Sequence, residues 1–147
     1  MKKEVDEIIT TTLYVTSKIL PLGEGIVYMT YEALGVTISD TAEGLFHNAM
    51  FRALGAMKIE KGIYKDERGW GVWTLQNGDK VFITYKGAGE AKPGGIVFGK
   101  GTITITGGTG KVAGIQGNFE FNRTMVRSSV EGVGQGYTKG KVKYTLP

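Results

Sequence analysis

The chain has 147 residues and a mass of 15.9 kDa, which fits one domain and is too short for two of ordinary size. Hydrophobic residues make up 41% and charged residues 22%, as in globular proteins with a core. The net charge of +4 is small and the basic residues are scattered, which argues against nucleic-acid binding. The absence of cysteine excludes disulfides, thiolate nucleophiles and cysteine-based zinc sites.

Glycine is unusually frequent, with 24 residues, and we expect it to mark tight turns and strand kinks. The sequence contains no run of 18 apolar residues, so it predicts no membrane span. Acidic residues follow the first two lysines where a signal peptide would be apolar, so a cytoplasmic location is the default expectation. A mature chain whose signal had been removed would begin in the same way, so secretion stays open.

The first half of the chain predicts strands with one ambiguous segment. Residues 5–16 and 25–38 are rich in the β-branched and aromatic residues that favour strands. Residues 45–54 fit a short helix closed by glycine and fit a strand equally well. We expect a further strand over residues 56–65 and a chain turn at residues 66–69.

The strongest local signal is a hairpin. Two strand-like runs, residues 70–76 and 80–86, flank Asn77-Gly78, the pair preferred in type I′ turns because both central residues need positive φ. Residues 100–106 and 117–123 alternate similarly around a glycine-rich loop, and a last strand covers about 132–146. Alternation places four large residues on one apolar face: Ile103, Ile105, Phe119 and Phe121.

These elements predict an all-β protein, a closed antiparallel barrel of about eight strands with at most one short helix. Closure removes the exposed edges that strands of this length would otherwise present. The barrel forms a single domain over residues 1–147, and the segment 1–22 can lie at its periphery. A barrel of eight strands has an interior wide enough for side chains or one small ligand.

Residues 99–117, with the sequence GKGTITITGGTGKVAGIQG, resemble the strand, glycine turn and strand of allene oxide cyclase barrel-like proteins and their bacterial lipocalin-like, calycin-type relatives. The preceding hairpin, from Gly69, also looks like theirs, and the resemblance covers some 55 of 147 residues. It implies an eight-stranded barrel, often trimeric in the plant cyclases, with a reactive lipid in the lumen. It also favours a strand over residues 45–54.

Motifs for catalysis are weak. The loop GGTGKVAG at 107–114 is not a phosphate-binding loop, because Val112 stands in place of Ser or Thr and a strand follows. His47 is the only histidine, so no histidine metal cluster can form, and His47 is either a wall residue or a proton donor or acceptor in the lumen. Among the carboxylates Glu24, Glu32, Asp40 and Glu43, Glu32 is the best acid–base candidate because Tyr28 shares its face.

Aromatic and branched residues supply the candidate ligand contacts. Trp70 and Trp73 lie on opposite faces of one strand, so only one of them can line the lumen. The candidate ligand-binding residues are Trp70, Tyr85, Ile103, Phe119 and Phe121.

Two classes of function remain open. The first is a lipocalin-like barrel that binds a small hydrophobic molecule without a cofactor. The second is a cofactor-free cyclase or isomerase, in which confinement fixes a reactive geometry. Large apolar residues also occur on both strand faces, so we expect a homodimer or homotrimer.

Overall fold

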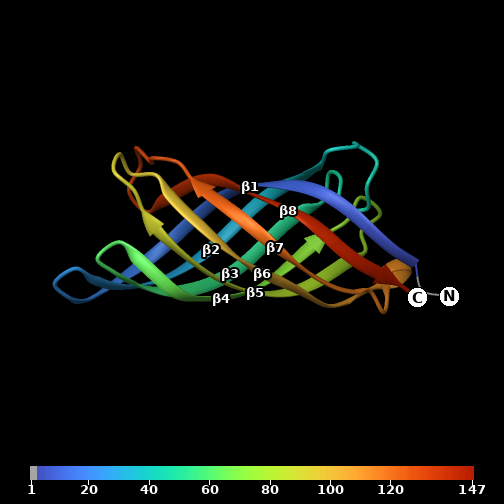
Figure 1. Ribbon diagram of the computed structural model, residues 1–147, viewed down its shortest axis with the longest axis horizontal. Coiled ribbons are helices and arrows are strands. Elements are labelled where there is room, and N and C mark those ends of the chain that lie inside the picture. Colours follow the sequence, from blue (N-terminus) through green and yellow to red (C-terminus); the bar gives the residue numbers. More distant parts are fainter. Residues whose placement is uncertain (1–2) are drawn as a thin grey trace.

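The computed structural model describes residues 3–147, which form one closed antiparallel barrel (Figure 1). Its eight strands are neighbours in chain order, and the predicted all-β barrel is therefore confirmed. The one helical element of these residues is a 3-10 turn, η1 (Gly110–Val112), and none of their helices is long or apolar enough to cross a membrane. The strands are β1 (Lys3–Gly23), β2 (Ile26–Ser39), β3 (Met50–Glu60), β4 (Ile63–Thr74), β5 (Lys80–Ala91), β6 (Val97–Gly108), β7 (Gln116–Met125) and β8 (Val133–Leu146).

The N-terminal strand closes the barrel. β1 pairs with β2 on one side and with β8 on the other, from Lys3 opposite Leu146 to Thr16 opposite Val133. A peripheral position for the segment 1–22 is therefore wrong from Lys3 onward, and residues 1 and 2 lie outside the described part of the chain. The segment belongs in the wall because both edges of β1 find partners there.

The region before and within β4 differs from the sequence-based expectation. Residues 45–54 are neither a helix nor a strand throughout, because turns continue to Asn48 and β3 begins at Met50. The single strand expected over 56–65 is wrong, because Lys61 and Gly62 form a turn with φ of 51° and 78°. The turn expected at 66–69 is also wrong, because these residues lie inside β4.

The hairpin around Asn77-Gly78 is confirmed, with Thr74 of β4 opposite Lys80 of β5. Its turn is not the expected type I′, since Gly78 has a positive φ of 91° and Asn77 does not. The side-chain oxygen of Asn77 instead accepts a hydrogen bond from the Asp79 N–H at 2.9 Å. A local side-chain bond thus replaces the second left-handed residue.

One end of the barrel is filled by side chains. Phe46, from the loop between β2 and β3, is fully buried and packs edge-on against Trp73 at 5.0 Å between ring centroids. Phe51 and Phe119 pack against the same indole at 5.0 and 6.3 Å. The indole N–H donates to Thr37 at 2.9 Å, which fixes the ring. This end carries both described chain ends, at the right of Figure 1.

Several glycines are required by close packing inside the barrel and not by turns. A Cβ on Gly69 would lie 2.1 Å from the Tyr85 ring, and one on Gly55 would lie 2.5 Å from the Tyr31 hydroxyl. The hydroxyl ends of the two tyrosines therefore lie directly over the glycine backbone, Tyr31 over β3 and Tyr85 over β4. These glycines give the lumen room for its polar groups.

Candidate functional site

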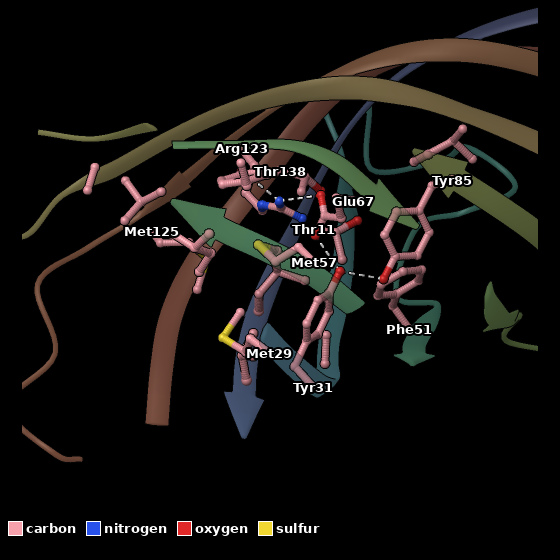
Figure 2. A pocket seen from close by; sticks show the side chains of 18 of the residues that line it. Thr11, Met29, Tyr31, Phe51, Met57, Glu67, Tyr85, Arg123, Met125 and Thr138 are labelled. Atoms are coloured by element: carbon pink, nitrogen blue, oxygen red, sulfur yellow. Dashed lines mark hydrogen bonds and ion pairs between the residues drawn. The ribbon is translucent and has the colours of Figure 1, made fainter. Parts of the chain in front are cut away.

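A cavity of about 260 Å³ lies inside the barrel above the packed end. It extends toward the opposite end, because Ile59, Gly62 and Val97, which flank the turns there, line it. Most of its wall is apolar. Figure 2 shows three adaptable methionines, Met29, Met57 and Met125, on the side of the polar groups away from Tyr85.

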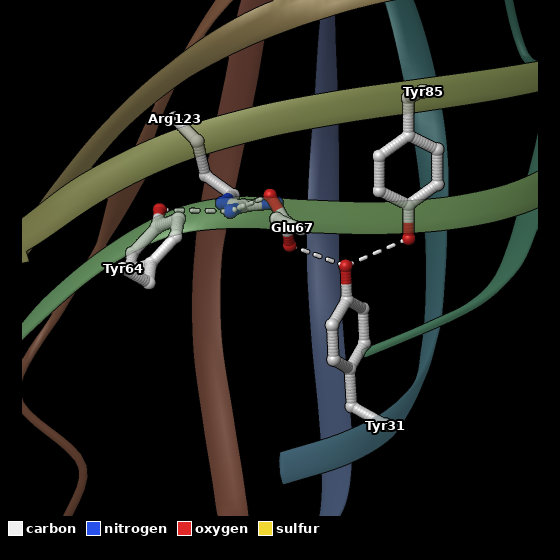
Figure 3. Close-up of polar contacts among 5 residues, drawn as sticks. All are labelled: Tyr31, Tyr64, Glu67, Tyr85 and Arg123. Atoms are coloured by element: carbon white, nitrogen blue, oxygen red, sulfur yellow. Dashed lines mark hydrogen bonds and ion pairs between the residues drawn. The ribbon is translucent and has the colours of Figure 1, made fainter. Parts of the chain in front are cut away.

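Five polar side chains meet at this cavity in one hydrogen-bonded cluster (Figure 3). Arg123 donates from Nη2 to Glu67 Oε1 at 2.5 Å and to the Tyr64 hydroxyl at 2.9 Å. The Tyr31 hydroxyl donates to Glu67 Oε2, and the Tyr31 and Tyr85 hydroxyl oxygens lie 2.7 Å apart. Because the Tyr31 hydrogen is used on Glu67, the Tyr85 hydroxyl donates to Tyr31.

Burial and neighbouring charges shift the pKa values of three groups in this cluster. Burial raises the pKa of Tyr85 to about 12, and burial together with the Glu67 charge raises the pKa of Tyr31 further. Burial alone would lower the pKa of Arg123, but the neighbouring Glu67 carboxylate outweighs it and raises that pKa. Tyr31 and Tyr85 are therefore neutral phenols beside the Arg123 cation.

A bulge in β4 brings the carboxylate inward. The pairing of β4 with β5 shifts register between Tyr64 and Glu67, so both side chains face the interior although they are three residues apart. The Glu67 side chain is 0% exposed. On β7, Arg123 follows Phe121 by two residues and shares its inward face, and its guanidinium carbon lies 5.8 Å from the Phe121 ring.

The predicted ligand contacts divide into three groups. Tyr85 and Ile103 line the cavity. Phe119 and Phe121 are buried behind its wall, where Phe121 packs edge-on against Tyr85 at 6.5 Å. Trp70, the remaining candidate, does not contact the lumen: it is 72% exposed on the outer face, opposite Leu54 of β3.

Trp73 takes the inward position in β4 that was left open between the two tryptophans, and it lines the cavity. On the outside, Trp70, Leu54 and Phe82 expose apolar surface on neighbouring strands. The homo-oligomer expected from the sequence stays a prediction, and it would cover these residues.

The catalytic candidates lie outside the lumen. Glu32 and Tyr28 do share a face, but it is the outer one, because Tyr31 and Ala33 take the inward positions of β2. Glu32 there accepts a hydrogen bond from Arg52 at 2.8 Å. His47 lies in the loop at the packed end, where its Nδ1 accepts from the Ser39 N–H at 3.1 Å.

Sequence reasoning missed the central residues of the cluster, although a signal for two of them was present. Counting back by twos from Trp73 places Glu67 on the inner face, and counting forward from Phe121 places Arg123 there. Glu67 was not considered as a lumen residue, because a turn was expected at residues 66–69. Tyr64 could not be found this way, because the bulge changes the parity of β4 before it.

Within residues 3–147, no group of three or more histidine, aspartate or glutamate side chains is arranged to hold a metal ion. No family model, no curated protein and no solved structure matches the chain. The closed eight-stranded barrel is consistent with calycin-like folds. The resemblance of residues 69–123 to the allene oxide cyclase group stays a prediction.

Proposed function

We propose that this protein binds one small hydrophobic molecule in the lumen of its barrel, as lipocalin-like proteins do. The observation that carries the proposal is the cavity of about 260 Å³, whose wall is mostly apolar and whose depth holds a polar cluster. Apolar cavities with a few convergent polar groups are typical of small-molecule sites. One end of the barrel is filled by packed aromatic side chains, whereas this part of the same lumen is open.

The cavity sets the size of the ligand. An apolar cavity of about 150 Å³ in another protein stays dry and accepts benzene. On that scale, a cavity of about 260 Å³ accepts a molecule of roughly ten to thirteen non-hydrogen atoms. A bicyclic aromatic such as naphthalene is therefore a suitable probe.

A pair of matched substitutions tests the proposal. Ala33 lines the cavity, whereas Ala56 on β3 faces outward, so Ala33→Leu fills the lumen and Ala56→Leu adds the same atoms outside. Isothermal titration calorimetry with naphthalene should show one saturable site in the wild type and in Ala56→Leu. Ala33→Leu should weaken that binding by at least about tenfold, since each buried methylene group contributes about 0.8 kcal/mol and the added side chain takes the space of several.

Absence of saturable binding in the wild type, or equal binding by both variants, would contradict the proposal. Mass spectrometry of an organic extract of the purified protein gives a second test, because a retained hydrophobic ligand would leave with the solvent.

The polar cluster favours a second candidate, a cofactor-free isomerase or cyclase of the allene oxide cyclase type. A buried carboxylate and phenols facing a cavity can hold a reactive molecule in one folded shape. Both Glu67 oxygens already accept hydrogen bonds, which favours binding over proton abstraction. Incubation with an unstable unsaturated epoxide separates the two functions: an isomerase yields an excess of one enantiomer of the cyclic product, and a binder yields none.

A further inference from the structure

We propose that the ligand carries an uncharged carbonyl oxygen, a ketone or aldehyde, that accepts hydrogen bonds from Arg123. This inference rests on the proposed binding function and names the chemistry that the same cavity selects. It follows from two properties of the polar cluster, namely the direction of its unused hydrogen bonds and the balance of its charges.

The cluster offers donors to a ligand. Within residues 3–147, both hydrogen bonds of Arg123 leave from Nη2. Its Nε and Nη1 atoms carry three more N–H groups. No buried side-chain nitrogen or oxygen of the described chain lacks a partner, so these two atoms are in contact with open space, and Arg123 lines the cavity. An oxygen that only accepts hydrogen bonds fits them.

Tyr31, Tyr85 and Glu67 cannot take this role as readily. The hydrogens of Tyr31 and Tyr85 are used inside the cluster, and both oxygens of Glu67 already accept hydrogen bonds. A ligand that must donate, such as an amine or amide N–H, would have to share carboxylate oxygens that already accept from Tyr31 and Arg123. The unused N–H groups of Arg123 therefore determine which polar group on a ligand the cavity prefers.

Charge balance selects a neutral oxygen. Glu67 and Arg123 form an ion pair in which the Glu67 side chain is 0% and the Arg123 side chain 11% exposed. No other cavity-lining residue is charged at neutral pH. A carboxylate ligand would leave the lumen with a net buried negative charge, which is costly in a low-dielectric interior, whereas a ketone adds none.

Three probes of nearly equal shape test the inference on the wild-type protein. They are 2-acetylnaphthalene, a ketone, 2-ethylnaphthalene, its hydrocarbon counterpart, and 2-naphthoate, an anion at neutral pH. Calorimetry should rank the ketone at least about tenfold tighter than either of the others, as expected for a hydrogen bond from a charged donor. The infrared carbonyl stretch of the bound ketone should also move to lower frequency than in hexane.

A substitution tests the charge argument separately. Glu67→Gln keeps the shape of the side chain and leaves Arg123 as an unbalanced cation. The affinity for 2-naphthoate relative to that for 2-acetylnaphthalene should then rise by about tenfold or more. Glu32→Gln is the matched control, because Glu32 forms its ion pair with Arg52 on the outer face, and it should leave the ratio unchanged.

The outcomes separate the two proposals. If the hydrocarbon binds as tightly as the ketone, or 2-naphthoate binds most tightly to the wild type, the carbonyl inference is overturned while the binding function stands. If none of the three probes binds, both are overturned. If Glu67→Gln fails to fold, the ranking on the wild type and the infrared shift still decide the inference.

Discussion

Replacing Arg123 by methionine isolates the contribution of the buried ion pair. The substitution keeps an apolar stem but removes the hydrogen bonds to Glu67 and to the Tyr64 hydroxyl, and with them the guanidinium near the rings of Tyr64 and Phe121. The Glu67 side chain is 0% exposed, so its carboxylate remains buried without a counter-ion. Breaking a buried pair in this way costs about 3–5 kcal/mol of unfolding free energy. The melting temperature should fall by roughly 10–16 °C.

The outer pair of Arg52 and Glu32 is the matched control. Its N–O distance of 2.7 Å is similar, but its side chains are 61% and 34% exposed, so Arg52→Met should cost about 0–1 kcal/mol. Urea unfolding of both variants measures the difference. The double variant Glu67→Met/Arg123→Met should recover most of the loss, because no unpaired charge then remains in the interior. Equal losses for Arg123→Met and Arg52→Met would refute the reasoning.

Three further expectations concern the packed parts of the barrel. Burial raises the pKa of Glu7, so the folded state binds its proton more tightly than the unfolded chain does. The unfolding free energy of the wild type relative to Glu7→Gln should therefore rise as pH falls toward 4.5, the ordinary pKa of a glutamate. Urea titrations that show this difference falling over the same pH range would contradict the expectation. Gly69→Ala should destabilise the protein by about 1–3 kcal/mol in the same assay because its Cβ would enter a tyrosine ring, whereas Gly107→Ala, whose nearest neighbour is 4.0 Å away, should not. Trp73→Phe keeps only the exposed Trp70, and Trp70→Phe keeps only the buried Trp73, so acrylamide should quench the fluorescence of Trp73→Phe much more strongly. Similar quenching of the two variants would contradict the assignment of Trp70 to the outer face and Trp73 to the interior.

Alternation within single strands was readable from the sequence. Ile103, Ile105, Phe119 and Phe121 were assigned to one face, and all four are buried inside the barrel. The period of two decides this, because successive side chains of a strand point to opposite faces whatever the neighbouring strands do. The same rule separated Trp70 from Trp73, but it could not say which face is the inner one.

The direction of each face depends on contacts between distant strands. Trp70 and Glu32 face outward because closure of the barrel turns Trp73 and Tyr31 inward, and no local pattern carries that information. Register has the same origin. The bulge in β4 that brings both Tyr64 and Glu67 inside exists only as a shift in pairing with β5.

The sequence by itself determined the class of this protein: an antiparallel barrel of about eight strands, set by alternation and turn residues, both of which act over a few positions. The tertiary structure alone decided the site. Glu67 and Arg123 are 56 positions apart in the chain and Tyr31 is 36 positions from Glu67, so their hydrogen bonds arise only when three strands meet across the lumen. Glycines such as Gly55 and Gly69 took on a role that composition could not indicate, because the space above a glycine is useful only once a distant tyrosine lies on it.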